Sequence, residues 1–127
     1  MEYDWRNWIE LARREMEHAG EALEVGAYFV TAFFAQQTAE ESLKGLWIAT
    51  SDGVPPHTHN LVELAAGLGA PEEIVDACMR LNPHYSASRY PDIAQGNPAG
   101  NYSETLASQL LGDAKEVFAL CSSQLQS

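Results

Sequence analysis

The stretch YFVTAFFAQQTAEESLKGLW, residues 28–47, constrains the fold of this chain more than any other. Gln36 and Glu40 lie in the middle of its main apolar sector, where an amide and a carboxylate are costly without hydrogen-bonding partners. A second, narrower apolar strip lies on another side. The stretch therefore predicts a long helix that is either central to a bundle or shared with a partner chain. When each residue is advanced by about 100° of helical rotation, the main sector collects Phe29, Ala32, Phe33, Leu43 and Trp47, and the second strip Val30, Phe34 and Ile48.

The rest of the chain also shows helical periodicity, and no strand pattern competes with it. Gly20 and Gly26 loosen a short connection, so we expect the first two helices to pack as an antiparallel hairpin. Asn60 followed by Glu63 has the spacing of a capping box. Pro83 disfavours a helical residue before it and predicts a helix end near Asn82. The expected helices span residues 3–23, 28–50, 60–68, 71–82 and 103–125.

These segments predict an all-α fold in one domain spanning residues 1–127. We expect an up-and-down antiparallel helical bundle of four main helices plus one short helix. A long loop, residues 86–102, precedes the last helix and contains two prolines and two glycines. Loops of this length in a compact domain are more often functional than not.

Charge limits the function classes. The net charge is -11, from 18 acidic and 7 basic residues, so the chain as a whole repels polyanions. The basic residues form no run, which excludes a basic tail or a large positive patch. Any nucleic-acid or nucleotide site must therefore be local.

The two cysteines, Cys78 and Cys121, lie at no metal-ligand spacing and fit buried thiols in a reducing compartment. No apolar run is long enough to span a membrane, and the first residues have no signal pattern. We therefore expect a cytoplasmic protein without a membrane partner.

Several segments resemble the HEPN domain family. They are DWRNWIELARREMEHA at 4–19, FFAQQTAEESLKGL at 33–46, THNLVEL at 58–64 and HYSASRYPD at 84–92. The resemblance covers nearly the whole chain in the family's order. It implies a helical bundle that forms a homodimer. It also implies a possible link to a minimal nucleotidyltransferase in a toxin–antitoxin pair, because family members are often encoded beside one and some are ribonuclease toxins.

Those ribonucleases resemble one another in an arginine followed, after four to six residues, by a histidine near the dimer interface. Arginine can hold a phosphate in a forked contact while histidine moves a proton. This sequence departs from that pattern, because only three residues separate Arg80 from His84 and Pro83 lies between them. Arg89 has no histidine after it, and Arg13 with His18 belongs to the wrong helix. The motif is therefore not matched at the expected place.

A binding site is a second possibility. Arg89 and Tyr90, with Asp92, lie in the long loop, and arginine beside tyrosine suits an anion or a stacked base. We predict that this loop folds back against Gln36 and Glu40. Arg89 could instead have a structural role, because a buried Glu40 carboxylate needs a cation to neutralise its charge.

Lys44 also has two interpretations, since it could complete a small anion pocket or pair at the surface with Glu40 or Glu41. The sequence thus predicts a ligand-binding cluster of Gln36, Glu40, Lys44, Arg89, Tyr90 and Asp92.

His57 and His59 are separated by one residue in a proline-rich loop and could be read as metal ligands or as proton-transfer groups. No thiolate or clustered carboxylates accompany them, so we predict no metal site and no cofactor. Tyr85 and Tyr102 bracket the long loop and are expected to anchor it.

Two functions from different classes follow. The first is a HEPN-type interaction protein that forms a homodimer and associates with a minimal nucleotidyltransferase in a toxin–antitoxin-like pair, or binds a nucleotide or an RNA phosphate, or does both. The alternative is a metal-independent ribonuclease toxin that uses Arg80, His84 and Arg89 in an altered arrangement. A helical scaffold without a ligand is a third, plainer possibility.

Overall fold

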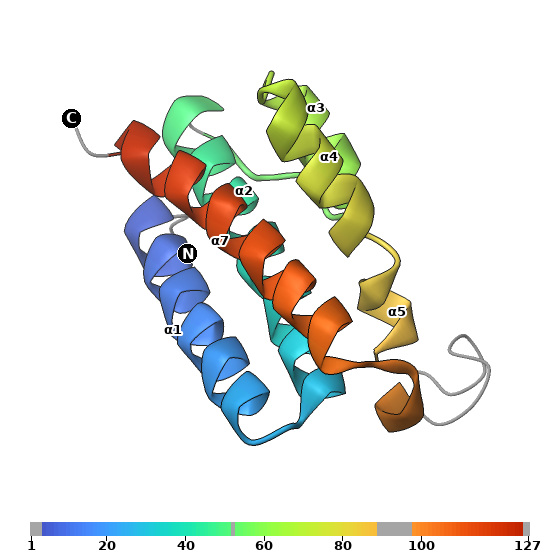
Figure 1. Ribbon diagram of the computed structural model, residues 1–127. Helices are drawn as coiled ribbons and strands as arrows, with labels where there is room; N and C mark the ends of the chain where they lie inside the picture. The colour runs from blue at the N-terminus through green and yellow to red at the C-terminus, as the bar shows by residue number, and fades with distance from the viewer. Residues whose placement is uncertain (1–3, 52, 89–97, 126–127) are drawn as a thin grey trace.

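The computed structural model describes residues 4–51, 53–88 and 98–125. Its main helices form an up-and-down bundle (Figure 1), and the described residues contain no strand, so the predicted all-α fold is confirmed. The helices are α1 (Trp5–Glu24), α2 (Tyr28–Ser51), α3 (Leu61–Gly67), α4 (Glu72–Leu81), α5 (His84–Ala87) and α7 (Glu104–Leu125), with a 3₁₀ turn η1 (Pro98–Asn101).

The connection between α1 and α2 is as short as predicted. Gly26 has a φ of 81°, a conformation that residues with a Cβ rarely adopt, and it lets the Ala27 N–H donate to the Ala22 carbonyl at 2.9 Å. The two helices therefore turn back on each other at once. In Figure 1 they run side by side with α7, while α3 and α4 lie together at one edge of the bundle.

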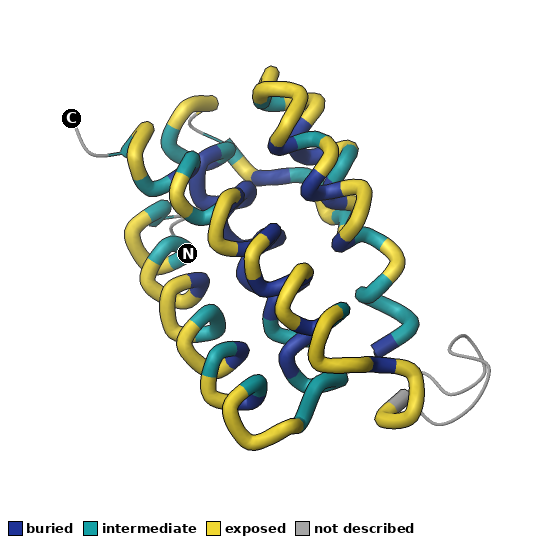
Figure 2. The backbone as a smooth tube through the Cα atoms, viewed as in Figure 1, coloured by how far each residue is buried: buried dark blue, intermediate teal, exposed yellow. Residues whose placement is uncertain are grey.

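Helix α2 occupies the centre. It contacts α1, α7, α3, α4, α5 and η1, and Figure 2 shows its buried residues enclosed by the other elements. A helix with this many neighbours buries polar residues as well as apolar ones. Thr31 donates to the Ala19 carbonyl at 3.2 Å, and Ser42 donates to the Thr38 carbonyl at 2.7 Å, which leaves neither hydroxyl unsatisfied. Of the two predicted roles for this helix, the central one is confirmed.

Asn60 caps α3 as predicted, because its side chain accepts a hydrogen bond from the Glu63 N–H at 3.1 Å. The second half of the capping box is replaced, because the Asn60 N–H donates to Thr58 Oγ1 at 3.0 Å and not to the Glu63 side chain. Asn82 extends this contact: its side-chain amide donates to Asn60 Oδ1 at 3.0 Å, and its Oδ1 accepts from the Leu61 N–H at 2.7 Å. The first turn of α3 is therefore tied to the end of α4.

Two details differ from the expectation. Residues 84–87 form the short helix α5 and 98–101 form η1, where a loop was expected over 86–102. A single turn is too short to show periodicity, and Pro83 is compatible with the start of a helix as well as with its end. Both cysteines are buried free thiols, as predicted. None of the described helices is long and apolar enough to cross a membrane.

Close packing of Trp47 against α3 gives a test of the fold. A Cβ added at Gly67 would lie 2.7 Å from both Cη2 and Cζ3 of the Trp47 indole, so Gly67→Ala must displace a rigid ring. We expect a loss of about 1–3 kcal/mol in the free energy of unfolding, measured by urea denaturation.

The matched control is Gly112→Ala in the middle of α7, where an added Cβ meets nothing within 4 Å. Alanine is the better helix former, so this variant should gain up to about 1 kcal/mol. Equal effects of the two substitutions would contradict the described contact between Trp47 and α3.

Candidate functional site

A cluster of polar side chains lies where α2 faces the connection to α3 and extends from the interior of the bundle to its surface. Its members are Gln36, Glu40, Lys44 and His59, called here the Glu40 cluster. Gln36, Glu40 and Lys44 are spaced four residues apart and therefore project from the same side of α2. All three are buried, and Glu40 is only 7% exposed. The structure thus brings together three of the predicted binding residues.

Glu40 is the centre of this cluster. Lys44 Nζ donates to Oε2 at 2.9 Å and Gln36 Nε2 donates to Oε1 at 3.1 Å. His59 Nδ1 lies 3.1 Å from each carboxylate oxygen. Burial alone would raise the pKa of Glu40, but the hydrogen bonds from Lys44, Gln36 and His59 outweigh it and hold that pKa below its usual range. The carboxylate is therefore ionised near neutral pH.

Lys44 pairs with Glu40, as one of its two interpretations expected, but the pair is not at the surface. The Lys44 side chain is 11% exposed and its ammonium is bound to Glu40, so the pair is a buried ion pair. The anion pocket that Lys44 could complete stays a prediction. The predicted pairing of Glu40 with a nearby cation is confirmed for Lys44. Arg89, Tyr90 and Asp92 lie outside the described residues, so the predicted return of their loop to this cluster stays a prediction.

His59 and Tyr85 complete the surroundings of Glu40. Their rings are stacked, with centroids 3.9 Å apart and an interplanar angle of 17°. The sequence pointed to His59 only as a possible metal ligand or proton-transfer group. Among the described residues, no group of three or more His, Cys, Asp or Glu side chains could hold a metal ion. Tyr85 belongs to α5, and His59 belongs to the connection between α2 and α3. Because His59 also contacts Glu40, the stack holds both elements against the middle of α2.

One atom of the cluster has no partner among the described residues. The Oε1 atom of Gln36 is buried and accepts no hydrogen bond there. Buried amide carbonyls in native proteins almost always accept a hydrogen bond. A donor from a ligand, a partner chain or another part of this chain would satisfy it.

Glu41 is the next residue along α2, but its environment is the opposite of that of Glu40. It faces Glu15 on α1. Burial, and then the charge and hydrogen bond of the Glu15 carboxyl, raise the pKa of Glu41 to about 9. Glu41 therefore keeps its proton at neutral pH. The sequence analysis missed this pair, because only the packing of α1 on α2 brings the two carboxyls together.

Arg80 and His84 have different partners. Arg80 donates to Asp113 of α7 through Nε at 3.0 Å and Nη2 at 2.9 Å, a two-pronged ion pair. The His84 Nδ1 atom lies 2.7 Å from the Tyr102 hydroxyl. Burial lowers the pKa of His84 and raises the pKa of Tyr102 to about 12, so both are neutral near pH 7. Arg80 thus links α4 to α7, and His84 links α5 to the two-residue connection between η1 and α7.

Comparison with known proteins agrees with the architecture and with this arrangement of motifs. The family model of the HEPN domain matches residues 5–124. The chain belongs to the HEPN domain family. This confirms the resemblance given by its motifs. No curated protein matches the chain.

Three solved structures are similar to this HEPN chain. TT1696 from Thermus thermophilus is 35% identical, with a TM-score of 0.87 over 95% of this chain and 98% of its own. ST0689, an archaeal HEPN homologue, is 28% identical, with a TM-score of 0.86 over 98% and 100% of the two chains. A HEPN domain protein from Thermotoga maritima is 24% identical, with a TM-score of 0.75 over 94% and 97%, and shares the fold.

The ion pair between Lys44 and Glu40 can be tested by removing its cation. Lys44→Met leaves a buried carboxylate without its positive partner, and we expect a loss of about 3–5 kcal/mol in the free energy of unfolding at pH 7. The loss should shrink at acid pH, where Glu40 takes up a proton. Lys115→Met, at an exposed position on α7, is the control and should stay within about 0.5 kcal/mol of wild type. Equal losses would contradict the burial of the pair.

The protonated Glu41 predicts a pH dependence of stability. Its folded pKa, about 9, is above the ordinary value of 4.5, so folding binds a proton between these two values. The contribution of Glu41 is complete below pH 4.5 and is lost as the pH rises towards 9. Glu41→Gln carries no such titration and mimics the protonated acid. It should therefore be more stable than wild type by about 1–3 kcal/mol at pH 8, and the difference should vanish near pH 4.5.

Thermal and urea unfolding between pH 4.5 and 9 measure this difference. Glu21→Gln, an exposed position on α1, is the control and should follow the wild-type curve. Parallel pH profiles for wild type and Glu41→Gln would show that Glu41 is ionised in the folded protein, against the expectation.

Proposed function

We propose that this chain is a non-catalytic HEPN-type interaction protein that forms a homodimer and associates with a minimal nucleotidyltransferase in a toxin–antitoxin-like pair. The observation that carries the proposal is the separation of Arg80 from His84. The guanidinium is bound to Asp113 and the imidazole to Tyr102, so each is committed to a contact within the chain. A ribonuclease of this family would need the two groups together at one phosphate.

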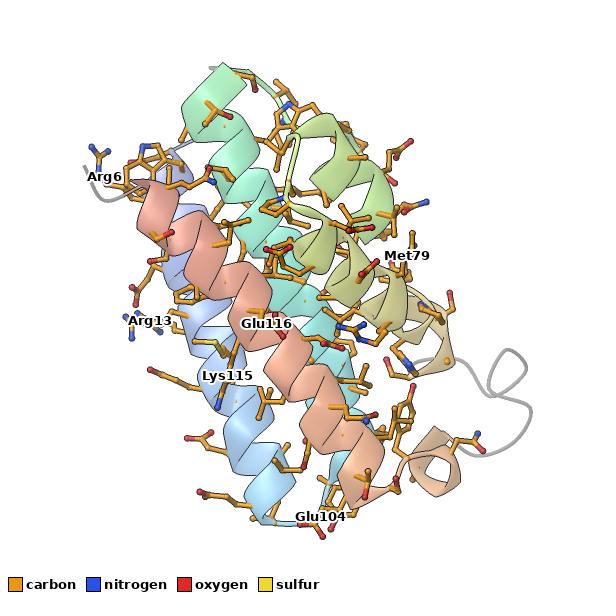
Figure 3. All side chains as sticks on the ribbon, turned by 45° about the horizontal axis from the view of Figure 1, so that its top comes forward. Arg6, Arg13, Met79, Glu104, Lys115 and Glu116 are labelled. Carbon is orange, nitrogen blue, oxygen red and sulfur yellow. The ribbon has the colours of Figure 1, made fainter. Side chains whose placement is uncertain are left out.

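The charge distribution supports binding to protein rather than to RNA. Most cations of the described residues already have an internal carboxylate partner: Arg6 pairs with Asp4, Arg13 with Glu10 and Glu17, Lys44 with Glu40, and Arg80 with Asp113. Figure 3 shows Arg6 and Arg13 pointing away from the bundle, on the outer side of α1. An acidic chain whose basic groups are largely neutralised in this way has little electrostatic attraction for a polyanion.

The homodimer is supported by the family and by aromatic residues of α2 that stay partly exposed. Phe33 and Phe34 on α2 contact each other edge to face, with ring centroids 5.1 Å apart, and both remain half-buried. Half-buried aromatic residues are enriched where protein surfaces associate. A second copy packed over this part of α2 would remove them from water.

Nucleotide or RNA-phosphate binding at the Glu40 cluster is the remaining part of the proposal. The unsatisfied Gln36 Oε1 can accept a hydrogen bond from a ribose hydroxyl or a base N–H, but not from an ionised phosphate, and the charge of Lys44 is already balanced by Glu40. A phosphate would therefore need a further cation, and Arg89 is the candidate that the sequence offers.

Three measurements test this function. Analytical ultracentrifugation at micromolar concentration should give a dimer, and a mixture with a minimal nucleotidyltransferase should sediment as a larger complex. RNA incubated with the protein in chelator should stay intact, and the double variant His84→Ala/Arg89→Ala should behave like wild type. Cleavage by wild type that the double variant lacks would establish the ribonuclease instead. A monomer that does not bind the nucleotidyltransferase would overturn the interaction role.

A further inference from the structure

The imidazole of His59 is held on two sides while much of it remains open to solvent. Its Nδ1 atom contacts both oxygens of Glu40 at 3.1 Å, and its ring stacks on Tyr85 at 3.9 Å. The side chain is nevertheless 54% exposed. One ring nitrogen and one face are therefore occupied, which leaves the opposite face and the edge with Nε2 as the parts of the ring without a described contact.

The contact with Glu40 decides which ring nitrogen has the lone pair. An ionised carboxylate only accepts hydrogen bonds, so the neutral imidazole must carry its proton on Nδ1. Nε2 then has the free lone pair. Within the described part of the chain, Nε2 makes no hydrogen bond. In this arrangement His59 Nε2 is the candidate nucleophile and the Glu40 carboxylate orients the ring. Side chains that take part in covalent catalysis are commonly activated and oriented by a neighbouring group in this way.

The backbone around His59 is fixed as well. Thr58 donates from its N–H to the Pro56 carbonyl at 3.0 Å and accepts at Oγ1 from the Asn60 N–H at 3.0 Å. Asn60 in turn caps α3. The ring therefore needs little reordering before a reaction, which lowers the entropic part of the barrier.

We propose that His59 is a phosphoryl-accepting histidine that reacts through Nε2 with donors of the phosphoramidate class. The Nε2 lone pair attacks phosphorus, a new N–P bond forms, and the P–N bond of the donor breaks. The leaving amine departs with the hydrogens that it already carries in the protonated donor. The ring becomes positively charged as the bond forms, and Glu40 stabilises that charge through the Nδ1–H. A phosphohistidine on another protein is a donor of this class.

The local charge allows an anionic donor to approach. Lys44 offsets the charge of Glu40 through its 2.9 Å ion pair, so the open edge of His59 does not stand over an unbalanced carboxylate. The other histidines lack this combination. His18 and His57 are exposed and have no carboxylate partner among the described residues, and His84 uses Nδ1 for Tyr102.

His57 is a built-in control, because it is an exposed histidine in the same loop. The full chain is incubated with phosphoramidate at neutral pH, and the phosphoryl group is located by peptide mass spectrometry under alkaline handling, since N–P bonds are acid-labile. We expect His59 to be labelled about ten times faster than His57 or more, in line with the effect of a carboxylate that orients a histidine. His59→Gln should abolish the fast phase, and His57→Gln should leave it unchanged.

Glu40→Gln should reduce the rate at His59 to that at His57, provided that circular dichroism shows the variant folded. A second readout needs no variant: the long-range ¹H–¹⁵N spectrum of wild type should show His59 protonated at Nδ1. Equal labelling of the two histidines in wild type, or a proton on Nε2, would overturn the proposal. Neither readout depends on dimerisation or on a nucleotidyltransferase, so the proposed function can fail separately.

Discussion

The rest of the structure depends on the burial of an ionised carboxylate, Glu40, in the central helix α2. A charge in that position is tolerated only when several donors surround it. Lys44, Gln36 and His59 supply them, and they come from two parts of the chain. The connection between α2 and α3 is therefore held against the bundle by electrostatics as well as by apolar contacts. Tyr85, stacked on His59, extends the same constraint to α5.

Glu40 and Glu41 show how strongly direction on a helix controls protonation. They are adjacent in sequence, yet one faces an ammonium and the other faces the carboxyl of Glu15. The first is ionised, and the second keeps a proton with a pKa of about 9. A rotation of about 100° between successive residues is enough to give the two carboxyls opposite neighbours. The interior of the bundle thus contains the ion pair of Lys44 with Glu40 and the carboxyl pair of Glu15 with Glu41. In the second pair, the proton on Glu41 removes the repulsion between two negative charges.

The sequence predicted most of the fold, because the fold rests on local signals. The apolar period identified α2 as the central helix, Asn60 with Glu63 marked the start of α3, and Gly26 marked the first turn. The same signals could not find α5, since one helical turn has no period to read. Trp47 was placed correctly in the main stripe but is only half-buried, because it lies on the edge of α3 at Gly67. Periodicity gives the direction of a side chain, and the neighbouring elements decide how much of it is covered.

The candidate site could be predicted only in part, for the same reason. Gln36, Glu40 and Lys44 share one side of one helix, so their spacing placed them together. His59 reaches Glu40 from a loop residue 19 positions further along. Nothing local in the sequence indicates that contact.

Arg80 illustrates the opposite case, where a short spacing in sequence is misleading. It lies four positions before His84, but Pro83 separates α4 from α5, and the two side chains contact Asp113 and Tyr102. Catalytic groups must meet at one reacting atom, so their separation in space outweighs their proximity in sequence. In this HEPN chain the histidine with an oriented ring and an open nitrogen is His59, and it owes that position to the buried charge of Glu40.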